Sequence, residues 1–353
     1  MKRITFTMVA LMVVAGKAVA GEIWREQSVR VVGRQGISAV EVTNARGRVD
    51  ARPSADGQIH VTALKIVRAS DETTRRRLAQ QTVVEAAPQG GRYVVRVRYP
   101  QRSSIRIGLW ESFAGVTWPR VEVRIVLEVP ADLPVALNGT SADLFTDGLA
   151  GPQTLKTTSG DAEVHDARGP MEMTSTSGDL AAAGIGRARI STVSGDLDIA
   201  GARGAVFART TSGDVLLRNS GDSLRIETVS GDVHADHASR DVYVHTTSGD
   251  IQIGGASGRV ELGSVSGEIV VALAQPLIGA EVETSSGDIR ATLATDLGCR
   301  LEMRTSAGSI EVGLPVETRT VTRREVSAVV RGGTTPVSLR TGSGSIVVTG
   351  GGK

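Results

Sequence analysis

The sequence of 353 residues is poor in cysteine and in aromatic residues, and it carries almost no net charge. Its single cysteine, Cys299, excludes a disulfide within the chain. Phe, Trp and Tyr together make up 3% of the residues, which disfavours a thick core packed around large rings. The 40 basic and 38 acidic residues nearly cancel. Because a nucleic-acid binder needs a basic patch or stripe, we expect no nucleic-acid partner.

The first 20 residues have the layout of a secretory signal. Lys2 and Arg3 precede an apolar run over residues 4–15, and residues 18–20 form an A-x-A cleavage site. The run is too short to span a membrane, and we expect no transmembrane span. Removal of this segment, which also holds Lys17, leaves a mature chain with a formal net charge of −1. We therefore predict an exported protein of the periplasm or the cell surface.

What the sequence has in abundance is one phrase, T-x-S-G-D followed by an aliphatic residue. The serines of successive copies lie 17 to 20 residues apart, and so regular a period is typical of stacked repeats. Weaker copies at residues 141–143, 307–309 and 343–345 extend the series, the last of them two steps beyond the one before. The eight full copies are taken as structural repeat corners: Ser159-Gly160-Asp161, Ser177-Gly178-Asp179, Ser194-Gly195-Asp196, Ser212-Gly213-Asp214, Ser230-Gly231-Asp232, Ser248-Gly249-Asp250, Ser266-Gly267-Glu268 and Ser286-Gly287-Asp288.

Apolar and polar residues alternate in two short runs between one corner and the next. In the repeat that follows Ser194, Leu197 and Ile199 form the first apolar pair, and Val206 and Ala208 form the second. Such alternation predicts strands with one buried face. A single coil cannot bury its apolar face alone, so the coils are stable only as neighbours. The sequence therefore predicts an all-β fold, a β-solenoid of coils of about 18 residues stacked at the strand spacing of about 4.8 Å.

The Ser-Gly-Asp corner has two interpretations. In the structural one, glycine supplies positive φ, and the Ser and Asp side chains accept backbone N–H groups that the turn leaves unpaired. In the other, the column of carboxylates binds Ca²⁺, which would relieve the repulsion between like charges in neighbouring coils. The Ca²⁺-binding β-roll offers a comparison, but its acids stand at both corners of each coil. The second corner here lacks such a column, so we expect no metal or other cofactor.

Residues 21–135 form a less regular, β-rich lead-in or cap before the repeats of residues 136–349. The residues from Ser70 to about Ala86 predict one short helix with Ser70 as N-cap. The segment from Thr43 to Val49 echoes the corner phrase, so the solenoid could begin there and be interrupted by an insertion. Strands are expected at residues 28–31, 39–42, 58–61, 92–97 and 121–127.

All three tryptophans lie in the lead-in. Trp110 and Trp118, with Phe113, belong to a non-periodic loop over residues 103–119. These rings either pack, together with Trp24, over the open end of the solenoid as a cap or bind a sugar, a peptide or a lipid surface. The sequence leaves both possibilities open.

No catalytic constellation stands out in this sequence. The repeat pattern does not bring the five histidines together at one place on its surface. The serines belong to the corner phrase, and no phosphate-binding loop occurs. An acid column is compatible with a polysaccharide-cleaving β-helix, but such enzymes need sugar-stacking rings, which are scarce here. We expect no enzyme and no catalytic residue.

The repeats resemble those of a bacterial domain-of-unknown-function family, the putative-adhesin family of the 4097 type. In that family a lead-in with a V-x-N-x-x-G-x-V phrase precedes stacked S-G-D coils. Residues 42–49 fit the phrase loosely and the repeats from Ser159 to Asp288 fit it closely, so the resemblance covers about residues 35–349. It implies a β-solenoid at the bacterial envelope and carries over no catalytic residue.

The function predicted from these observations is a non-enzymatic, exported β-solenoid that serves as an adhesin-like binding or scaffolding module at the cell envelope. Its expected partner is an envelope glycan or protein. The alternatives are a Ca²⁺-stabilised structural rod and a carbohydrate-active β-helix enzyme.

Overall fold

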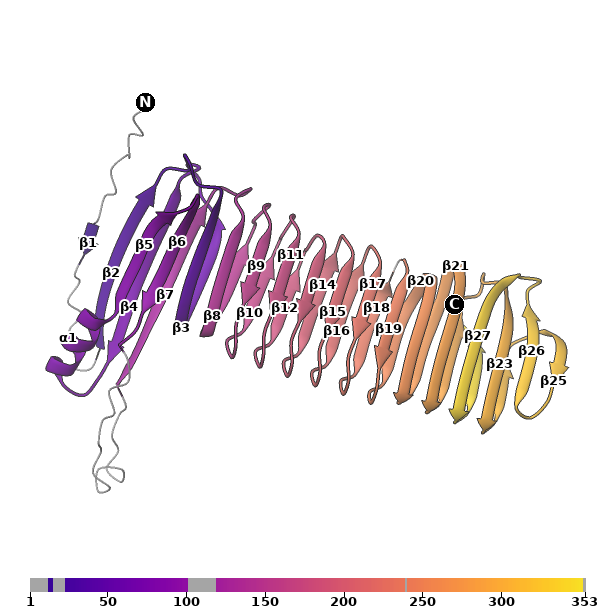
Figure 1. The fold of residues 1–353 in the computed structure, drawn as a ribbon. Helices are drawn as coiled ribbons and strands as arrows, with labels where there is room; N and C mark the ends of the chain where they lie inside the picture. The colour runs from indigo at the N-terminus through magenta and orange to yellow at the C-terminus, as the bar shows by residue number, and fades with distance from the viewer. Residues whose placement is uncertain (1–11, 15–22, 101–118, 239, 352–353) are drawn as a thin grey trace, which may run out of the picture. The chain divides into compact units, whose positions relative to one another are not determined.

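The computed structural model describes residues 12–14, 23–100, 119–238 and 240–351. The chain divides into two compact units, Met1–Gly169 and Pro170–Lys353. Both consist of β-strands, and a single short helix lies in the first unit, so the predicted all-β class is confirmed for the described residues (Figure 1). Most of the predicted signal segment and the loop with Trp110, Phe113 and Trp118 lie outside them.

The first unit holds ten strands and the helix among its described residues. Their bounds are β1 Met12–Val14, β2 Ile23–Val32, β3 Ala39–Pro53, β4 Ile59–Arg68, α1 Glu72–Gln81, β5 Val83–Gln89, β6 Arg92–Arg98, β7 Arg120–Val129, β8 Val135–Asp147, β9 Gln153–Lys156 and β10 Ala162–His165.

Strands β3 and β8 are the first two coils of the solenoid. They pair in parallel from Val40 with Val135 through Asn44 with Gly139, and again from Arg46 with Ser141 onward. Each strand therefore passes through a corner and contributes to two sheets. Strands β5 and β6 extend the sheet beside the first half of β3, and β2, β4 and β7 extend the sheet beside its second half. The interpretation of residues 43–49 as an early corner followed by an insertion is confirmed.

Helix α1 is shorter than the sequence predicts. Its N-cap is Asp71, not Ser70, and the Asp71 carboxylate accepts the N–H of Thr74 at 2.7 Å. The helix ends at Gln81 because Val83 begins strand β5, which pairs antiparallel with β6. One side of the helix packs through Leu78 and Ala79 on an apolar cluster that includes Trp24. Trp24 thus packs against the helix, whereas the cap predicted from Trp110, Phe113 and Trp118 lies outside the described residues.

The second unit is built almost entirely from repeated strands. Their bounds are β11 Met171–Thr174, β12 Leu180–Ala183, β13 Ala188–Ser191, β14 Leu197–Ala202, β15 Val206–Arg209, β16 Val215–Ser220, β17 Leu224–Glu227, β18 Val233–Ala238, β19 Val242–Thr246, β20 Ile251–Ser266, β21 Ile269–Ser286, β22 Ile289–Leu293, β23 Cys299–Ala307, β24 Ile310–Gly313, β25 Glu317–Val321, β26 Glu325–Val330, β27 Thr335–Ser343 and β28 Ile346–Gly350.

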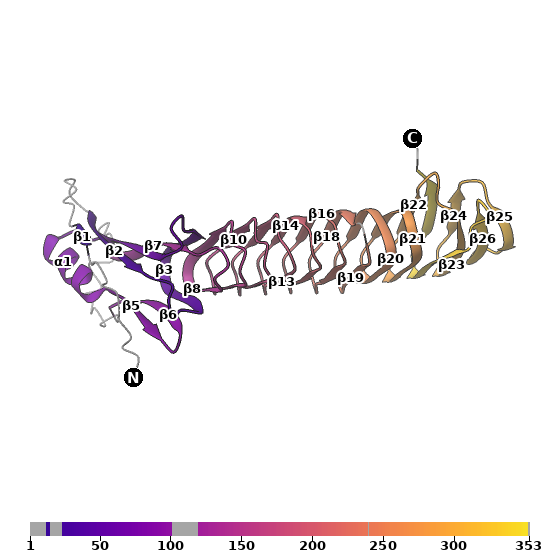
Figure 2. The same cartoon turned by 90° about the horizontal axis from the view of Figure 1, so that it is seen from above.

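Each coil of the second unit contributes one strand to each of two facing parallel sheets (Figure 2). The forward strands follow the acid of each corner and pair in register, so that Leu197, Val215 and Val233 form one buried row. The return strands lead to the next corner and form equivalent rows on the facing sheet, such as Val206 with Leu224. The predicted alternation of buried and outward residues is confirmed in these coils.

The C-terminal end of the second unit departs from a simple staircase. Strand β27 lies between β21 and β23, and β28 lies between β22 and β24. Ser343 is therefore one coil from Ser286 and separates it from Ala307, so the expectation that residues 343–345 come two steps after residues 307–309 is wrong. The reason is that the antiparallel hairpin of β25 and β26 occupies the outer edge of β23. Residues 317–330 therefore form this hairpin and not a further coil.

Among the described residues, no helix has the length and apolar character that crossing a membrane requires.

Candidate functional site

The eight Ser-Gly-Asp or Ser-Gly-Glu segments stand at corners where one coil contacts the next. A Cβ at Gly213 would overlap the carbonyl oxygen of Gly195, and the same holds for Gly231 over Gly213. None of the eight glycines is among the described residues with positive φ. The expectation that glycine serves here for positive φ is therefore wrong. Glycine is required because the backbones of adjacent coils approach too closely for a side chain.

At four of the corners the glycine N–H is accepted by the hydroxyl of the residue two places before the serine. Thr210, which is 2% exposed, accepts the N–H of Gly213 at 3.0 Å, and Thr192 and Gly195 repeat the contact at 3.2 Å. The equivalent buried hydroxyls of Thr228 and Thr246 have no hydrogen-bond partner among the described residues. The corner serines contribute their backbone instead, as when Ser212 N–H donates to the Val193 carbonyl at 2.9 Å. The hydrogen-bonding role expected of the serine side chain thus belongs to the buried threonine.

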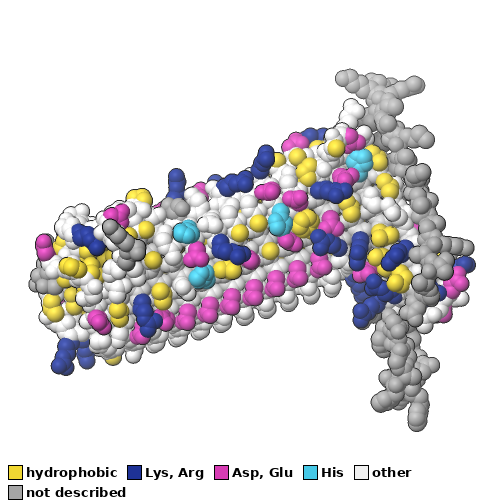
Figure 3. Space-filling view, turned by 180° about the vertical axis from the view of Figure 1, so that it is seen from behind, with side chains coloured by type: hydrophobic (Ala, Val, Ile, Leu, Met, Phe, Trp, Pro, Cys, Tyr) yellow, Lys and Arg dark blue, Asp and Glu magenta, His cyan; other side chains and the backbone are white. Residues whose placement is uncertain are grey.

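The acids of the corners form a continuous row in the second unit (Figure 3). The Oδ1 atom of Asp196 accepts the backbone N–H of Asp214 at 2.9 Å, and the Asp214 and Asp232 carboxylates accept from the next coil in the same way. Each carboxylate is thereby held beside an N–H dipole, which offsets part of the repulsion between neighbouring charges. In the described part of the chain, no three His, Cys, Asp or Glu side chains are grouped to hold a metal ion.

The histidines pair with single acids where they have acidic partners. His165 lies 2.6 Å from Glu163, and His234 lies 3.2 Å from Asp236. Cys299 is buried, and this burial raises the pKa of its thiol to about 11. The thiol therefore stays protonated near neutral pH. These groups offer no activated nucleophile within the described residues.

The outer face of the return strands carries a column that the repeat itself aligns. Strands β13, β15, β17 and β19 pair in register, so that Arg189, Phe207, Arg225 and Tyr243 lie in one row. The guanidinium carbon of Arg189 lies 4.5 Å from the centre of the Phe207 ring, and that of Arg225 lies 4.2 Å from the Tyr243 ring. These distances are within the range of cation–π contacts. We call these four residues the arginine–aromatic column.

The register position that follows Tyr243 is Glu261, and a histidine two residues from Tyr243 on the same strand lies against the backbone of the next coil. The His245 ring stacks on Tyr243 with centroids 5.3 Å apart and an interplanar angle of 14°. A Cβ at Gly263, the register partner of His245, would overlap the imidazole ring. Glycine at this position therefore leaves room for the ring. Phe207 and Tyr243 are partly exposed, whereas His245 and the two arginines of the column are exposed.

The sequence carries a signal for this column in the outward positions of the repeats, which inward periodicity alone does not reveal. Phe207 and Tyr243 are the only aromatic residues after residue 150, and the four members of the column follow one another at intervals of 18 residues. Aligned at the repeat period, the outward positions predict the column. The two rings that follow residue 150 are thus neighbours on the outer face and not part of the thin interior.

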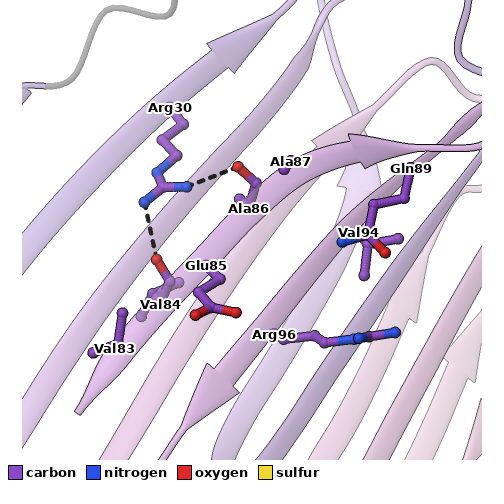
Figure 4. A pocket seen from close by; sticks show the side chains of 9 residues that line it. All are labelled: Arg30, Val83, Val84, Glu85, Ala86, Ala87, Gln89, Val94 and Arg96. Atoms are coloured by element: carbon purple, nitrogen blue, oxygen red, sulfur yellow. Dashed lines mark hydrogen bonds between the residues drawn. The ribbon is translucent and has the colours of Figure 1, made fainter. Parts of the chain in front are cut away.

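A hollow in the first unit lies between strands β2 and β5 (Figure 4). Its volume is about 420 Å³, and Val83, Ala87, Val94 and Arg96 belong to its lining. The Arg30 guanidinium crosses it and donates to the carbonyl oxygens of Val84 at 2.9 Å and Ala86 at 3.0 Å. Arg30 thus occupies the hydrogen-bonding edge of β5, where another strand could otherwise add.

A second hollow of about 510 Å³ lies on the return-strand face near the C-terminal hairpin. It includes Arg304, Arg324 and Arg340. Arg304 pairs with Glu325 at 2.8 Å, and Arg340 lies 3.7 Å from Glu281. Two of the three positive charges are therefore matched within the protein.

Comparison with solved structures finds similar chains of low identity. A "putative adhesin" from Bacteroides fragilis is 11% identical, with a TM-score of 0.27 over 92% of this chain and 96% of that one. A "putative adhesin" from Parabacteroides distasonis is 10% identical, with a TM-score of 0.32 over 91% and 96% of the two chains. A "putative lipid binding protein" from the same species is 12% identical, with a TM-score of 0.27 over the same shares. No curated protein matches the chain.

Comparison with family models finds one family that accounts for most of the chain. The model described as Toastrack DUF4097 matches residues 54–219, 155–241 and 189–349. Together these matches extend from the insertion of the lead-in to the last strand of the solenoid, well over half of the sequence. This chain belongs to the Toastrack DUF4097 family.

Proposed function

We propose that this chain is an exported, non-enzymatic binding module of the bacterial cell envelope. In this proposal residues 1–20 are a signal removed on export, residues 21–135 form the lead-in, which includes the first coil at β3, and residues 136–349 form the remaining coils of the binding solenoid. The observation that carries the proposal is the return-strand face of the second unit. There, side chains of the kinds that bind ligands, arginines and aromatic rings, are held outward at the strand spacing by a scaffold of parallel strands.

A repeated scaffold of this kind suits binding because it fixes the separation of its surface groups. Outward residues of successive return strands lie one strand spacing apart, about 4.8 Å. Contacts that are weak one by one then act together on a long partner. The buried rows of Val, Ile and Leu keep the strands in register, so the order on the surface does not depend on the ligand.

The test uses cysteine chemistry, because the only natural cysteine is buried. Glu261 and Gln252 are exposed residues of the same strand, β20, on the return and forward legs of one coil. Glu261→Cys and its matched control Gln252→Cys each receive a photo-crosslinker and are expressed in the native host. We expect the full chain in the exported fraction and envelope adducts mainly from position 261.

The outcomes separate the parts of the proposal. A chain confined to the cytoplasm would overturn export. Equal labelling from the two positions, or none from either, would overturn a binding role for the return-strand face. Turnover of an envelope polysaccharide by the purified protein, abolished by changing one acid, would overturn the non-enzymatic assignment.

A further inference from the structure

We infer that the arginine–aromatic column is a binding site for an acidic polysaccharide whose sugars carry carboxylates, such as a polyuronate. The inference rests on the proposed binding function and names the ligand class and the residues that contact it. It stands on the geometry of the column, on the charge around it and on its contrast with the opposite face.

The stacking within the column fixes the two arginines. Each guanidinium lies over a ring of the neighbouring return strand, so its plane is held by packing while its N–H edges stay at the exposed surface. An arginine ordered in this way loses less conformational entropy when it binds. Planar guanidinium groups form paired hydrogen bonds with carboxylates. At Arg189 this edge is open to a ligand carboxylate, whereas Nε and Nη2 of Arg225 already donate to Glu227 at 2.9 and 2.7 Å, so a ligand carboxylate competes with Glu227 at that second site.

The separation of these two sites suits a polymer more than a single small anion. Phe207 stands between Arg189 and Arg225, so their backbones lie two strand spacings apart, about 10 Å. One carboxylate cannot reach both guanidinium groups. An extended chain with carboxylates at regular intervals engages both at once, and the second contact strengthens the first. The partly exposed edges of Phe207 and Tyr243 offer apolar surface to the sugar rings between the acids.

The charge around the column is complementary to such a chain. Arg187 and Arg209 are exposed on the same face, and neither forms an ion pair. The nearby acids are Glu227, which pairs with Arg225 at 2.7 Å, Glu172, the register partner of Arg189, and Glu261, the register partner of Tyr243. Four arginines therefore face three carboxylates, an excess of one positive charge.

The forward-strand face of the same coils lacks these features. Its corresponding outward row reads Ala181, Asp198, Leu216 and His234. Arg218 on that face is paired with Asp198 at 2.6 Å, as Arg225 is with Glu227, but it does not stack on a ring as Arg189 and Arg225 do. Because the two sheets are built on equivalent buried rows, the difference between their outer faces does not arise from folding requirements alone.

The test compares three polymers and four forms of the full chain. Polygalacturonate is the polyuronate, dextran is the neutral glycan and oligo-dT is a polyanion of a different class. Binding is measured by biolayer interferometry at low and at physiological salt. The proteins are the native sequence, Arg189→Ala/Arg225→Ala, Arg225→Lys and the control Arg218→Ala.

We expect the native protein to bind polygalacturonate and not dextran, with weaker binding at higher salt. The double variant should lose affinity by about tenfold or more, since each charge-assisted hydrogen bond contributes on that order. Arg225→Lys keeps the charge but not the planar fork, so it should lose part of the affinity. Arg218→Ala should bind like the native protein. Far-UV circular dichroism checks that all four are folded.

Several results would overturn the inference. They are no binding to polygalacturonate at low salt, equal losses in the double variant and Arg218→Ala, equal binding to dextran, and tighter binding to oligo-dT than to polygalacturonate. If envelope adducts still form from position 261 while polygalacturonate fails to bind, the binding function stands and this ligand class is wrong. If both fail, the function and the inference fall together.

Discussion

The corner of the first coil and the corners of the second unit are held by hydrogen bonds from different kinds of residue. In several coils of the second unit a buried threonine accepts the N–H of the corner glycine, and the corner aspartates accept a backbone N–H from coil to coil. At the first corner, Asn44 donates to the Val123 carbonyl at 2.7 Å, and the Tyr99 hydroxyl lies 2.6 Å from the Asn44 amide oxygen. Many similar hydrogen bonds stabilise the repeated corners of the second unit. The first corner instead depends on one network of different residues that are distant in sequence.

The largest effect is expected where coils approach most closely. Gly213→Ala places a Cβ on the Gly195 carbonyl, and relief requires the backbones of two coils to move apart. We expect a loss of about 3 kcal/mol in the free energy of unfolding, measured by urea denaturation. The control is Gly221→Ala, whose Cβ would meet only the Ala202 carbonyl oxygen at 3.5 Å. Equal losses in the two variants would contradict the close-approach explanation.

The network of the first corner should be nearly as sensitive. Asn44 is fully buried, and Asn44→Ala leaves the Val123 carbonyl and the Tyr99 hydroxyl without this partner. We expect a loss of about 2 to 3 kcal/mol. All tryptophans precede residue 119, so tryptophan fluorescence reports on the first unit. Tyr99→Phe, which removes only the hydroxyl, should cost less. A loss for Asn44→Ala no larger than that of Tyr99→Phe would contradict the central role of the amide.

A single repeated threonine should matter less than Asn44. Thr210→Val keeps the shape but removes the acceptor for the Gly213 N–H, and we expect a loss of about 1 kcal/mol. The matched control is Thr211→Val, because Val193 and Val229 already stand exposed at the equivalent place in neighbouring coils. Thermal melting followed by circular dichroism should leave the Thr211 variant within about 0.5 kcal/mol of the native protein. A larger loss for Thr211→Val than for Thr210→Val would contradict the structural role of the Thr210 hydroxyl.

The smallest expected effect is that of calcium. Each corner carboxylate from Asp196 to Asp250 accepts a backbone N–H of the following coil, and the carboxylates stand one to a coil. We expect the melting midpoint to be the same with Ca²⁺ and with a chelator. A rise with Ca²⁺ that saturates, and that Asp214→Asn reduces, would instead support a calcium-stabilised rod.

Much of the fold could be predicted because period-two alternation and the 18-residue repeat act over short distances. The inward rows, from Leu197 to Val233 and beyond, follow from residue type alone. The role of Thr210 could not be separated from that of Ser212 without coordinates, since both are hydroxyl residues of one turn. The order of the last coils could not be predicted because it depends on the antiparallel pairing of β26 with β23, and this pairing produces no repeat in the sequence. The arginine–aromatic column was available from outward residues at the same period.

The position of β27 has a consequence for how this end of the solenoid is assembled. Strand β27 lies between β21 and β23. Strand β23 can therefore take its place in the sheet only after β27, which comes later in the sequence, has paired with β21. The Ser345 N–H donates to the Asp288 carboxylate across 57 residues of sequence, and closing such a distance slows folding relative to the local coil-on-coil growth of the preceding repeats. A chain that ends before Thr335 would lack β27, an inner strand of the sheet. Strands β23 to β26 would then lack the pairing that joins them to the preceding coils.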